Sequence, residues 1–181
     1  DGETLLARIA EGGVPTFGYS PRPLQAWLRA ARSAGVDTLI ADVLDNTPHA
    51  AADHRLLAEH GSEVARGLAI LARVLRARTT MLAVDQRRTG AYRDSVAPAH
   101  YYGIQTVALP HKYPIGAPPI LTKVLTRREV RPGGGGLQVG VAVIDATTCW
   151  AAYRWVACNE RPVGRVVTRI SGSAHASKPR S

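Results

Sequence analysis

The stretch Thr38–Leu75, TLIADVLDNTPHAAADHRLLAEHGSEVARGLAILARVL, decides the fold. It opens with a short apolar run, Thr38–Leu44, which is bounded by turn signals and is typical of a buried parallel strand. A loop over Asp45–Ala50 follows. Over Asp53–Leu75, apolar residues recur at steps of three and four, which predicts a long helix with one apolar face. The stretch therefore predicts a strand, a loop and a helix in succession.

The same alternation continues on both sides of this unit. Further strands are predicted at Thr79–Val84, Ile104–Leu109, Val139–Ile144 and Gly164–Ile170. Helices are predicted at Thr4–Ala10, Leu24–Ala34, Gly90–Val96, Ile120–Leu125 and Thr147–Cys158. Strands that alternate with helices indicate an α/β fold with a mainly parallel sheet flanked by helices. We expect one domain over residues 1–172 and a flexible tail over residues 173–181, because that tail is small, polar and basic.

The net charge of the chain indicates which classes of partner it could bind. The formal net charge is +9, from 23 basic and 14 acidic residues. Such a balance is typical of proteins that meet nucleic acid, anionic lipid or an acidic protein. The basic residues are spread over several segments, and aromatic residues make up only 6%, so no aromatic platform for bases accompanies them. We therefore predict no nucleic-acid binding.

Cysteine and histidine content argues against a metal site. The chain has two cysteines, Cys149 and Cys158, whereas an Fe–S cluster needs four ligands, so we expect no cluster held by this chain. His49, His54 and His60 do not share a helix face, and we interpret them as surface histidines rather than metal ligands. The first residues lack the basic and apolar regions of a signal peptide, which predicts a cytoplasmic location.

Three long segments carry a family resemblance that covers nearly the whole chain. Thr38–Leu75 is similar, without a gap, to a segment I-N-x-A-E-C-E-P-Y-x-T-A-D-x-R-L that runs into a helix. Leu109–Val130, LPHKYPIGAPPILTKVLTRREV, is similar to L-P-x-K-Y-P-x-G-x-x-x-Q-L-x-x-x-L-T-G-R-E-V. Val139–Gly172 is similar to a closing segment V-G-V-x-x-x-N-V-x-T-A-Y that leads into R-V-V-T-V-T-G. The chain thus resembles the flavin- and NADH-binding domain of the RnfC, PduS and complex I flavoprotein-subunit family.

The resemblance implies an electron-transfer function. Domains of this family bind FMN, accept hydride from NADH as substrate and pass single electrons to Fe–S clusters on later domains or partner subunits. FMN carries the reactive chemistry, so the resemblance names no catalytic side chain. It implies a subunit of a redox complex, with a cytoplasmic location that is either free or peripheral to the inner face of a membrane-bound assembly. The cofactor-binding positions carried over are Gly13, Gly18, Arg22, Asp42, Asp45, Asp145 and Thr148.

The family's phosphate loop, G-x-G-G-x-G-F-P, is altered in this chain. Glycines in such a loop let backbone N–H groups approach a phosphate. Aligned without gaps, only Gly18 and Pro23 match, while Tyr19 adds bulk and Pro21 removes an N–H donor. Arg22 offers a charged phosphate contact instead. Two interpretations stay open: the FMN cradle is rebuilt around Arg22, or it is lost.

The acidic motif differs as well. Asp42 replaces a family Asn, Asp45 replaces a Glu and Asp145 replaces a second Asn, whereas Thr148 is kept. Asp45 serves either as a partial substitute for the Glu or as an ordinary turn residue. A carboxylate at Asp145 that faced an anionic cofactor would be unfavourable unless paired. The run Asp45–Pro48 is also similar to D-T-N-P in NqrA, a subunit with a related fold that lacks the standard flavin loop. The alternative function is therefore a cofactor-free docking module whose Arg-rich surface meets acidic partners.

Overall fold

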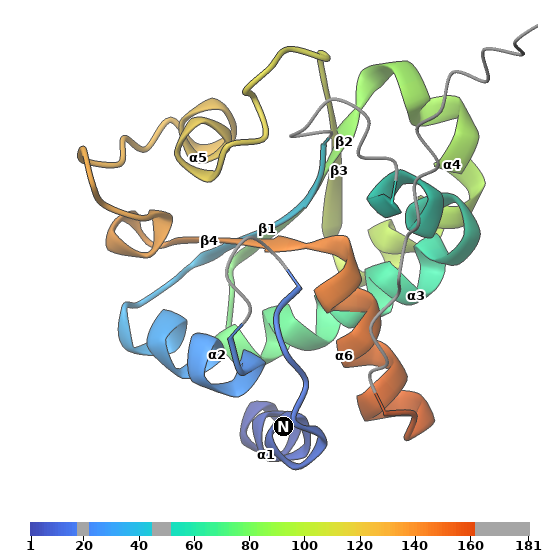
Figure 1. Ribbon diagram of the computed structural model, residues 1–181, viewed down its shortest axis with the longest axis vertical. Helices are drawn as coiled ribbons and strands as arrows, with labels where there is room; N and C mark the ends of the chain where they lie inside the picture. The colour runs from blue at the N-terminus through green and yellow to red at the C-terminus, as the bar shows by residue number, and fades with distance from the viewer. Residues whose placement is uncertain (18–21, 45–51, 162–181) are drawn as a thin grey trace, which may run out of the picture.

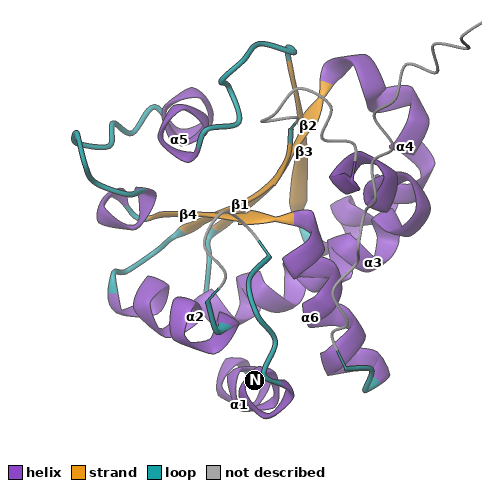
Figure 2. Cartoon of the chain, viewed as in Figure 1, coloured by secondary structure: helices purple, strands orange, loops and turns teal. Residues whose placement is uncertain are grey.

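The computed structural model of the chain describes residues 1–17, 22–44 and 52–161 (Figures 1 and 2). Within these ranges a four-stranded sheet has the order β3-β2-β1-β4, and all neighbouring strands are parallel. The strands are β1 (Thr38–Val43), β2 (Thr79–Asp85), β3 (Ile104–Leu109) and β4 (Val141–Asp145). This arrangement confirms the predicted parallel sheet flanked by helices. The predicted closing strand Gly164–Ile170, the tail after residue 172 and the loop Asp45–Ala50 lie outside the described residues.

The helices follow the predicted positions. They are α1 (Gly2–Gly12), α2 (Leu24–Ser33), α3 (Ala52–Leu75), α4 (Thr89–Val96), α5 (Pro118–Thr126) and α6 (Ala146–Cys158). Short 3₁₀ turns occur at η1 (Gln86–Arg88), η2 (Ala97–Tyr102) and η3 (Gly136–Val139). The prediction that the fourth strand starts at Val139 is wrong. Val139 ends η3, and Gly140 follows in the left-handed region with φ of 76°, so the chain becomes extended only from Val141.

The two faces of the sheet are covered unequally. Successive side chains of a strand point to opposite faces, so Leu39, Ala41 and Val43 join the larger core formed with α1, α2, α3 and α6. Ile40 and Leu44 point the other way, into a smaller core beneath α5. Figure 1 shows α5 on one side of the sheet and α3 and α6 on the other. The α5 side is the thinner layer, with fewer buried apolar residues on the described part of the chain.

Close packing of α3 against α6 fixes the larger layer. Gly67 of α3 lies so near α6 that a Cβ placed on it would meet the Cys149 carbonyl oxygen at 1.8 Å. Trp150 and Trp155 of α6 pack partly buried against the same core. Because β4 leads directly into α6, this contact also fixes where the carboxyl end of β4 lies.

His54 corrects one interpretation from the sequence. It is only 4% exposed, so it is not a surface histidine. The residue lies one turn before the buried Leu57 in the first part of α3, and the apolar stripe continues through Val64 and Leu68 after a kink at His60. The three- and four-residue steps of that stripe extend back to residue 54, which places the imidazole inside.

Candidate functional site

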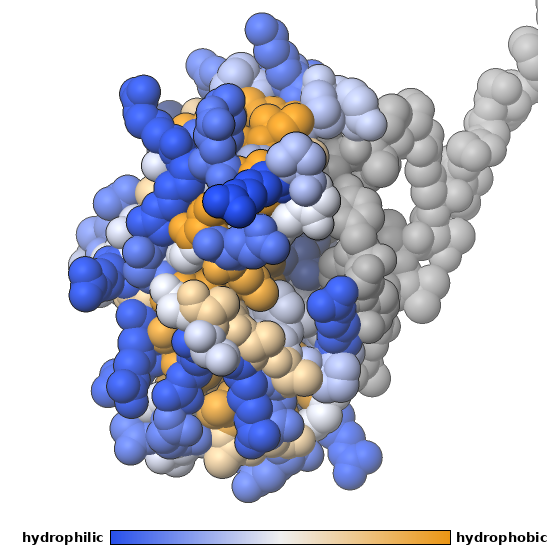
Figure 3. All heavy atoms as spheres, turned by 90° about the vertical axis from the view of Figure 1, so that its left-hand side faces the viewer, coloured by the Kyte–Doolittle hydropathy of each residue, from blue (hydrophilic) through white to orange (hydrophobic). Residues whose placement is uncertain are grey.

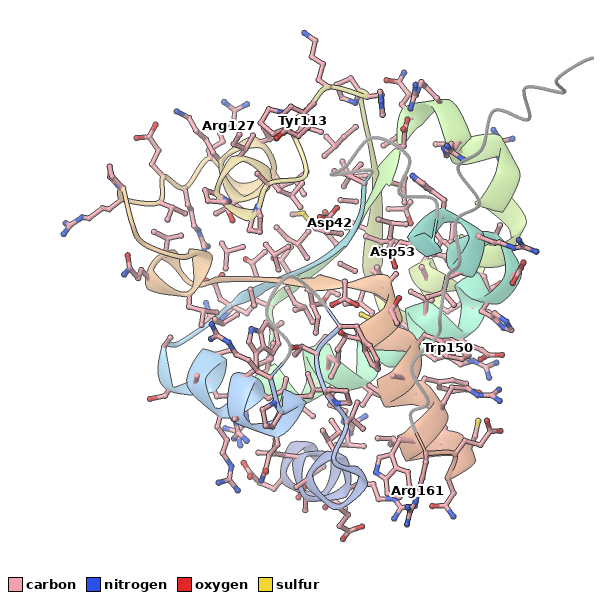
Figure 4. The ribbon with its side chains drawn as sticks, viewed as in Figure 1. Asp42, Asp53, Tyr113, Arg127, Trp150 and Arg161 are labelled. Carbon is pink, nitrogen blue, oxygen red and sulfur yellow. The ribbon has the colours of Figure 1, made fainter. Side chains whose placement is uncertain are left out.

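Two predicted cofactor residues lie near the carboxyl ends of neighbouring strands. Asp42 of β1 and Asp145 of β4 are register partners at the carboxyl edge of the sheet. Asp42 follows Ile40 by two residues and so faces the α5 side, where its Oδ1 accepts a hydrogen bond from the Leu44 N–H at 2.9 Å. Figure 4 labels Asp42 near this end of β1, with Asp53 of α3 beyond it. In parallel α/β sheets, ligands bind at this edge.

Asp145 and Thr148, both predicted site residues, are joined at the start of α6. The Asp145 Oδ1 accepts from the Thr148 N–H at 2.7 Å, and its Oδ2 accepts from the Thr148 hydroxyl at 2.7 Å. The Thr148 oxygen in turn accepts from the Phe17 N–H at 2.9 Å. Asp145 is therefore the N-cap of α6, and Thr148 ties the segment that follows α1 to that cap.

Asp53 adds a third carboxylate to the same region. Its Oδ1 accepts from the Thr147 hydroxyl at 3.0 Å. Burial raises the pKa of the Cys149 thiol well above its usual value, and the carboxylates of Asp145 and Asp53 raise that pKa further. The start of α6 is thus a site of negative potential. We call Asp42, Asp53 and Asp145 the acidic half of the carboxyl edge.

In the described part of the altered glycine loop, the two ends of the loop are hydrogen-bonded to each other. Gly13 has φ of 57° and caps the end of α1, where its N–H donates to the Ala10 carbonyl at 3.2 Å. The Thr16 N–H donates to the Arg22 carbonyl at 2.8 Å, and the Arg22 N–H donates to the Thr16 hydroxyl at 3.0 Å. The Arg22 side chain is exposed beside this turn. Gly18 and Asp45 lie outside the described residues.

The acidic half does not fit the phosphate of FMN at the start of α6. A helix N-terminus binds an anion when its N–H groups are available, but Asp145 already accepts from the Thr148 N–H. A phosphate ester carries nearly two negative charges at neutral pH and would meet the carboxylates of Asp145 and Asp53 here. The Asp145 carboxylate thus occupies the N–H group at the start of α6 that an anionic ligand would otherwise bind.

The carboxyl ends of β2 and β3 hold a constellation that the sequence did not reveal. Asp85, the last residue of β2, has a side chain only 1% exposed. Its Oδ1 accepts from the Arg87 N–H at 2.8 Å, and its Oδ2 accepts from Arg87 Nη2 at 2.9 Å. His111 Nδ1 lies 2.9 Å from the same Oδ2. Burial alone would raise the pKa of Asp85, but the hydrogen bonds from Arg87 and His111 outweigh it and lower the pKa to about 2.

The two side chains that bind Asp85 each have a basic neighbour in sequence. Arg87 and His111 are 55% and 41% exposed, and Arg88 and Lys112 are exposed beside them in sequence. We call Arg87, Arg88, His111 and Lys112 the basic half of the carboxyl edge. The pairing of residues 85 and 111 arises because β2 and β3 are neighbours, with Asp85 opposite Leu109. The only sequence signal was the proximity of Asp-Gln-Arg-Arg and His-Lys to the ends of two predicted strands.

The described residues offer neither a metal cluster nor a membrane-spanning helix. No group of three or more histidine, cysteine, aspartate or glutamate side chains in these ranges is arranged to hold a metal ion. Over the same part of the chain, no helix is both long and apolar enough to cross a membrane.

Two solved structures match the chain in fold. The NAD⁺-reducing NiFe hydrogenase in its H₂-reduced state has a chain that superposes with a TM-score of 0.72 at 19% identity, covering 84% of this chain and 30% of that one. Its air-oxidized state superposes with a TM-score of 0.70 at 18% identity. At these identities the likeness concerns the fold, which is that of a parallel-sheet domain within a longer chain.

Sequence comparison identifies the family. Residues 9–154 match the model of the Nuo51 FMN-binding domain, and the chain belongs to that family. The RnfC protein of the ion-translocating oxidoreductase complex of Erwinia tasmaniensis is 32% identical over 167 residues, which cover 91% of this chain and 20% of the relative. Its counterpart in Serratia proteamaculans is 31% identical over 171 residues, which cover 94% and 24%. The chain therefore spans about a quarter or less of the length of these relatives, and the expected resemblance to RnfC is confirmed.

Proposed function

We propose that this chain is the electron-transfer domain of an NADH-oxidising, RnfC-like redox subunit that passes electrons through FMN to Fe–S partners. The observation that carries the proposal is the match of residues 9–154 to an FMN-binding domain model. FMN, when bound, supplies the hydride-accepting and one-electron chemistry. The relatives named as components of an ion-translocating complex support a setting within a multi-subunit redox assembly, peripheral to a membrane.

The chain's own residues have positioning roles in this proposal. Thr148 and Asp145 anchor the segment after α1 through the Phe17 N–H, which holds the start of the altered loop against the carboxyl edge. Arg22, exposed at the other end of that loop, is the cation that would contact a flavin phosphate. Gly18 and Asp45 stay proposals from the resemblance.

The experiment that tests the proposal is an FMN titration followed by flavin fluorescence, with NADH added to the loaded protein. We expect micromolar binding and bleaching of the flavin absorption band by NADH. The variant Arg22→Gln should weaken FMN binding about tenfold, because it removes one charge-assisted hydrogen bond. The matched control Arg29→Gln removes the same charge from the exposed face of α2 and should bind FMN like the unchanged chain.

A second candidate, a cofactor-free docking module, is favoured by the capping of α6. Asp145 occupies the helix end where an incoming phosphate would bind, and the neighbouring carboxylates oppose one. The α5 layer offers a surface for docking, since Tyr113, Ile120 and Val124 are exposed by 79%, 39% and 47%. Figure 3 faces the side of the molecule where α5 lies and shows apolar residues among hydrophilic ones. Absence of FMN binding at high micromolar concentration would exclude the first candidate and leave this one.

A further inference from the structure

We propose that the outer surface of α5, together with the turn before it, binds an anionic lipid bilayer. The inference goes beyond the proposed function, because it involves neither FMN nor NADH. This surface lies on the side of the sheet with the thinner layer, the side that Figure 3 shows. We call it the α5 surface, and it is defined by six exposed residues, which are Lys112, Tyr113, Ile120, Lys123, Val124 and Arg127.

The helix α5 has an exposed apolar row in addition to its buried face. Leu121 and Thr122 are fully buried, so their side of the helix packs toward the sheet. Residues three and four positions apart are neighbours on a helix, and Ile120, Lys123 and Val124 have that spacing on the outer side. Ile120 and Val124 are 39% and 47% exposed. The outer row therefore presents two branched apolar side chains with a lysine between them.

Tyr113 adds an aromatic ring, which is 79% exposed. Backbone hydrogen bonds fix the turn that carries it. The Ile115 N–H donates to the Lys112 carbonyl at 2.7 Å. The Ala117 N–H, at the N-cap of α5, donates to the Pro114 carbonyl at 2.8 Å. Tyrosine suits the boundary between lipid and water, because its ring enters the apolar layer while its hydroxyl stays hydrated.

The charge of the α5 surface is positive. The segment Lys112–Arg131 contains five basic residues and one acidic residue, Glu129. Lys123 pairs with Glu129 at 2.8 Å, yet its side chain stays 64% exposed. Arg128 is bound internally, where it donates to the two oxygens of Asp37 at 2.8 and 3.1 Å. The remaining cations attract an anionic surface and oppose a second copy of this basic chain.

Arg127 occupies a backbone position that favours glycine. It ends α5 in the left-handed region, with φ of 60° and ψ of 9°. Residues with a Cβ are uncommon in that region, and glycine is the usual residue at this end of a helix. The Arg127 side chain is exposed, and Figure 4 labels it beside α5. A strained backbone that carries an exposed cation indicates a role for the cation outside the fold.

The combination of lysine and apolar residues favours a bilayer over a protein partner. Lysine is depleted in protein–protein interfaces. At a bilayer, lysine and arginine stems lie along the apolar layer while their charged ends reach the anionic head groups. Two of the three lysines of the chain, Lys112 and Lys123, belong to the α5 surface. The surface thus suits a shallow apolar contact reinforced by attraction to the head groups.

The test is cosedimentation of the flavin-free chain with lipid vesicles. Phosphatidylcholine vesicles with about 30% phosphatidylglycerol should bind the chain at least about tenfold more tightly than vesicles of phosphatidylcholine alone. Binding should weaken between roughly 50 and 500 mM salt, because salt screens the exposed cations.

Matched variants assign the binding to the α5 surface. Arg127→Gln should weaken it about fivefold, the value expected for one cation at an anionic membrane. Arg127→Lys keeps the charge, and Arg29→Gln removes an equal charge from α2, so each should change the affinity by less than about twofold. Tyr113→Ser combined with Val124→Ser should weaken binding about tenfold through loss of the apolar contact.

Arg127→Gly separates binding from folding. Glycine relieves the left-handed strain, so this variant should unfold at a higher urea concentration than the unchanged chain. Its vesicle binding should nevertheless weaken as much as that of Arg127→Gln. If Arg127 had only a structural role, its replacement by glycine would leave vesicle binding unchanged.

Three outcomes would overturn the proposal: no preference for anionic over neutral vesicles, equal affinities of Arg127→Gln and Arg29→Gln, or binding of soluble polyglutamate without binding of anionic vesicles. The last outcome would favour an acidic protein as the partner. Because no flavin is present, the result is independent of the FMN titration. Vesicle binding without FMN binding would support this inference and exclude the flavin function, and the opposite pair of results would do the reverse.

Discussion

The acidic and basic halves of one sheet edge differ in which protein groups bind their carboxylates. At β1 and β4, carboxylates are bound by the protein's own N–H and hydroxyl groups, such as Thr148 and Thr147, so that half is closed by internal contacts. At β2, the carboxylate of Asp85 is buried and accepts hydrogen bonds from the half-exposed Arg87 side chain, with His111 beside it. The two halves thus differ in what holds a carboxylate: neutral N–H and hydroxyl groups at the start of α6, and basic side chains at the end of β2.

The largest effect on stability is expected where α3 packs against α6, because this contact positions the acidic half but not the basic half. Gly67→Ala should destabilise the protein by about 3 kcal/mol or more, because the added Cβ would lie 1.8 Å from the Cys149 carbonyl oxygen and force α6 away from α3. Gly90→Ala in α4, beside the basic half, is the matched control. It meets open space and should be neutral or stabilising by about 0.5–1 kcal/mol. Urea unfolding measures both, and equal effects would contradict the packing described here.

The next largest effect is the loss at low pH of the stability that ionised Asp85 contributes. Its pKa of about 2 lies below the ordinary value, so its ionised form stabilises the folded state. This contribution, roughly 2 kcal/mol, is fully present above the unfolded-state pKa near 4 and is lost as the pH falls toward 2. Asp85→Asn should therefore be less stable than the unchanged chain at pH 6, and the difference should shrink at pH 3. A difference that stays constant with pH would show that Asp85 acts through packing rather than charge.

A smaller effect sharpens the account of the α6 cap. Asp145→Ala should cost about 1 kcal/mol of unfolding free energy, because the Thr148 N–H loses its side-chain acceptor. Asp145→Asn should cost less than about 0.5 kcal/mol, since Asn is an equally good N-cap. The comparison of the two variants in urea isolates the cap from the charge. A large cost for Asn would mean that the negative charge itself holds this end of α6.

Much of the fold was predictable because periodicity is a local property. The apolar runs of β1, β2 and β3 and the stripe of α3 are visible in the sequence, and the sheet follows from their alternation. The start of β4 was predicted at Val139 rather than Val141 because no change in hydropathy marks the left-handed turn at Gly140. His54 was wrongly predicted to be on the surface because its polarity was given more weight than the apolar stripe around it.

The site was predictable only where its contacts are local. Asp145 and Thr148 are three residues apart, which is the spacing of an N-cap, and the resemblance pointed to both. Asp85 and His111 are 26 residues apart and meet only because β2 and β3 are adjacent strands. No sequence motif specifies that pairing. Strand order, which depends on the packing of the whole sheet, was required to find it.

The smallest expected effect tests whether the two halves are independent. Asp42 lies on β1, the strand next to β2, and strands are about 4.8 Å apart. A unit charge about 10 Å away in water contributes roughly 0.4 kcal/mol, and salt near 0.15 M screens much of that. Asp42→Asn should therefore change the destabilisation caused by Asp85→Asn by less than about 0.4 kcal/mol in a double-mutant cycle measured by urea unfolding. A coupling free energy above about 1 kcal/mol would mean that the two carboxylates interact directly and that the halves are not independent.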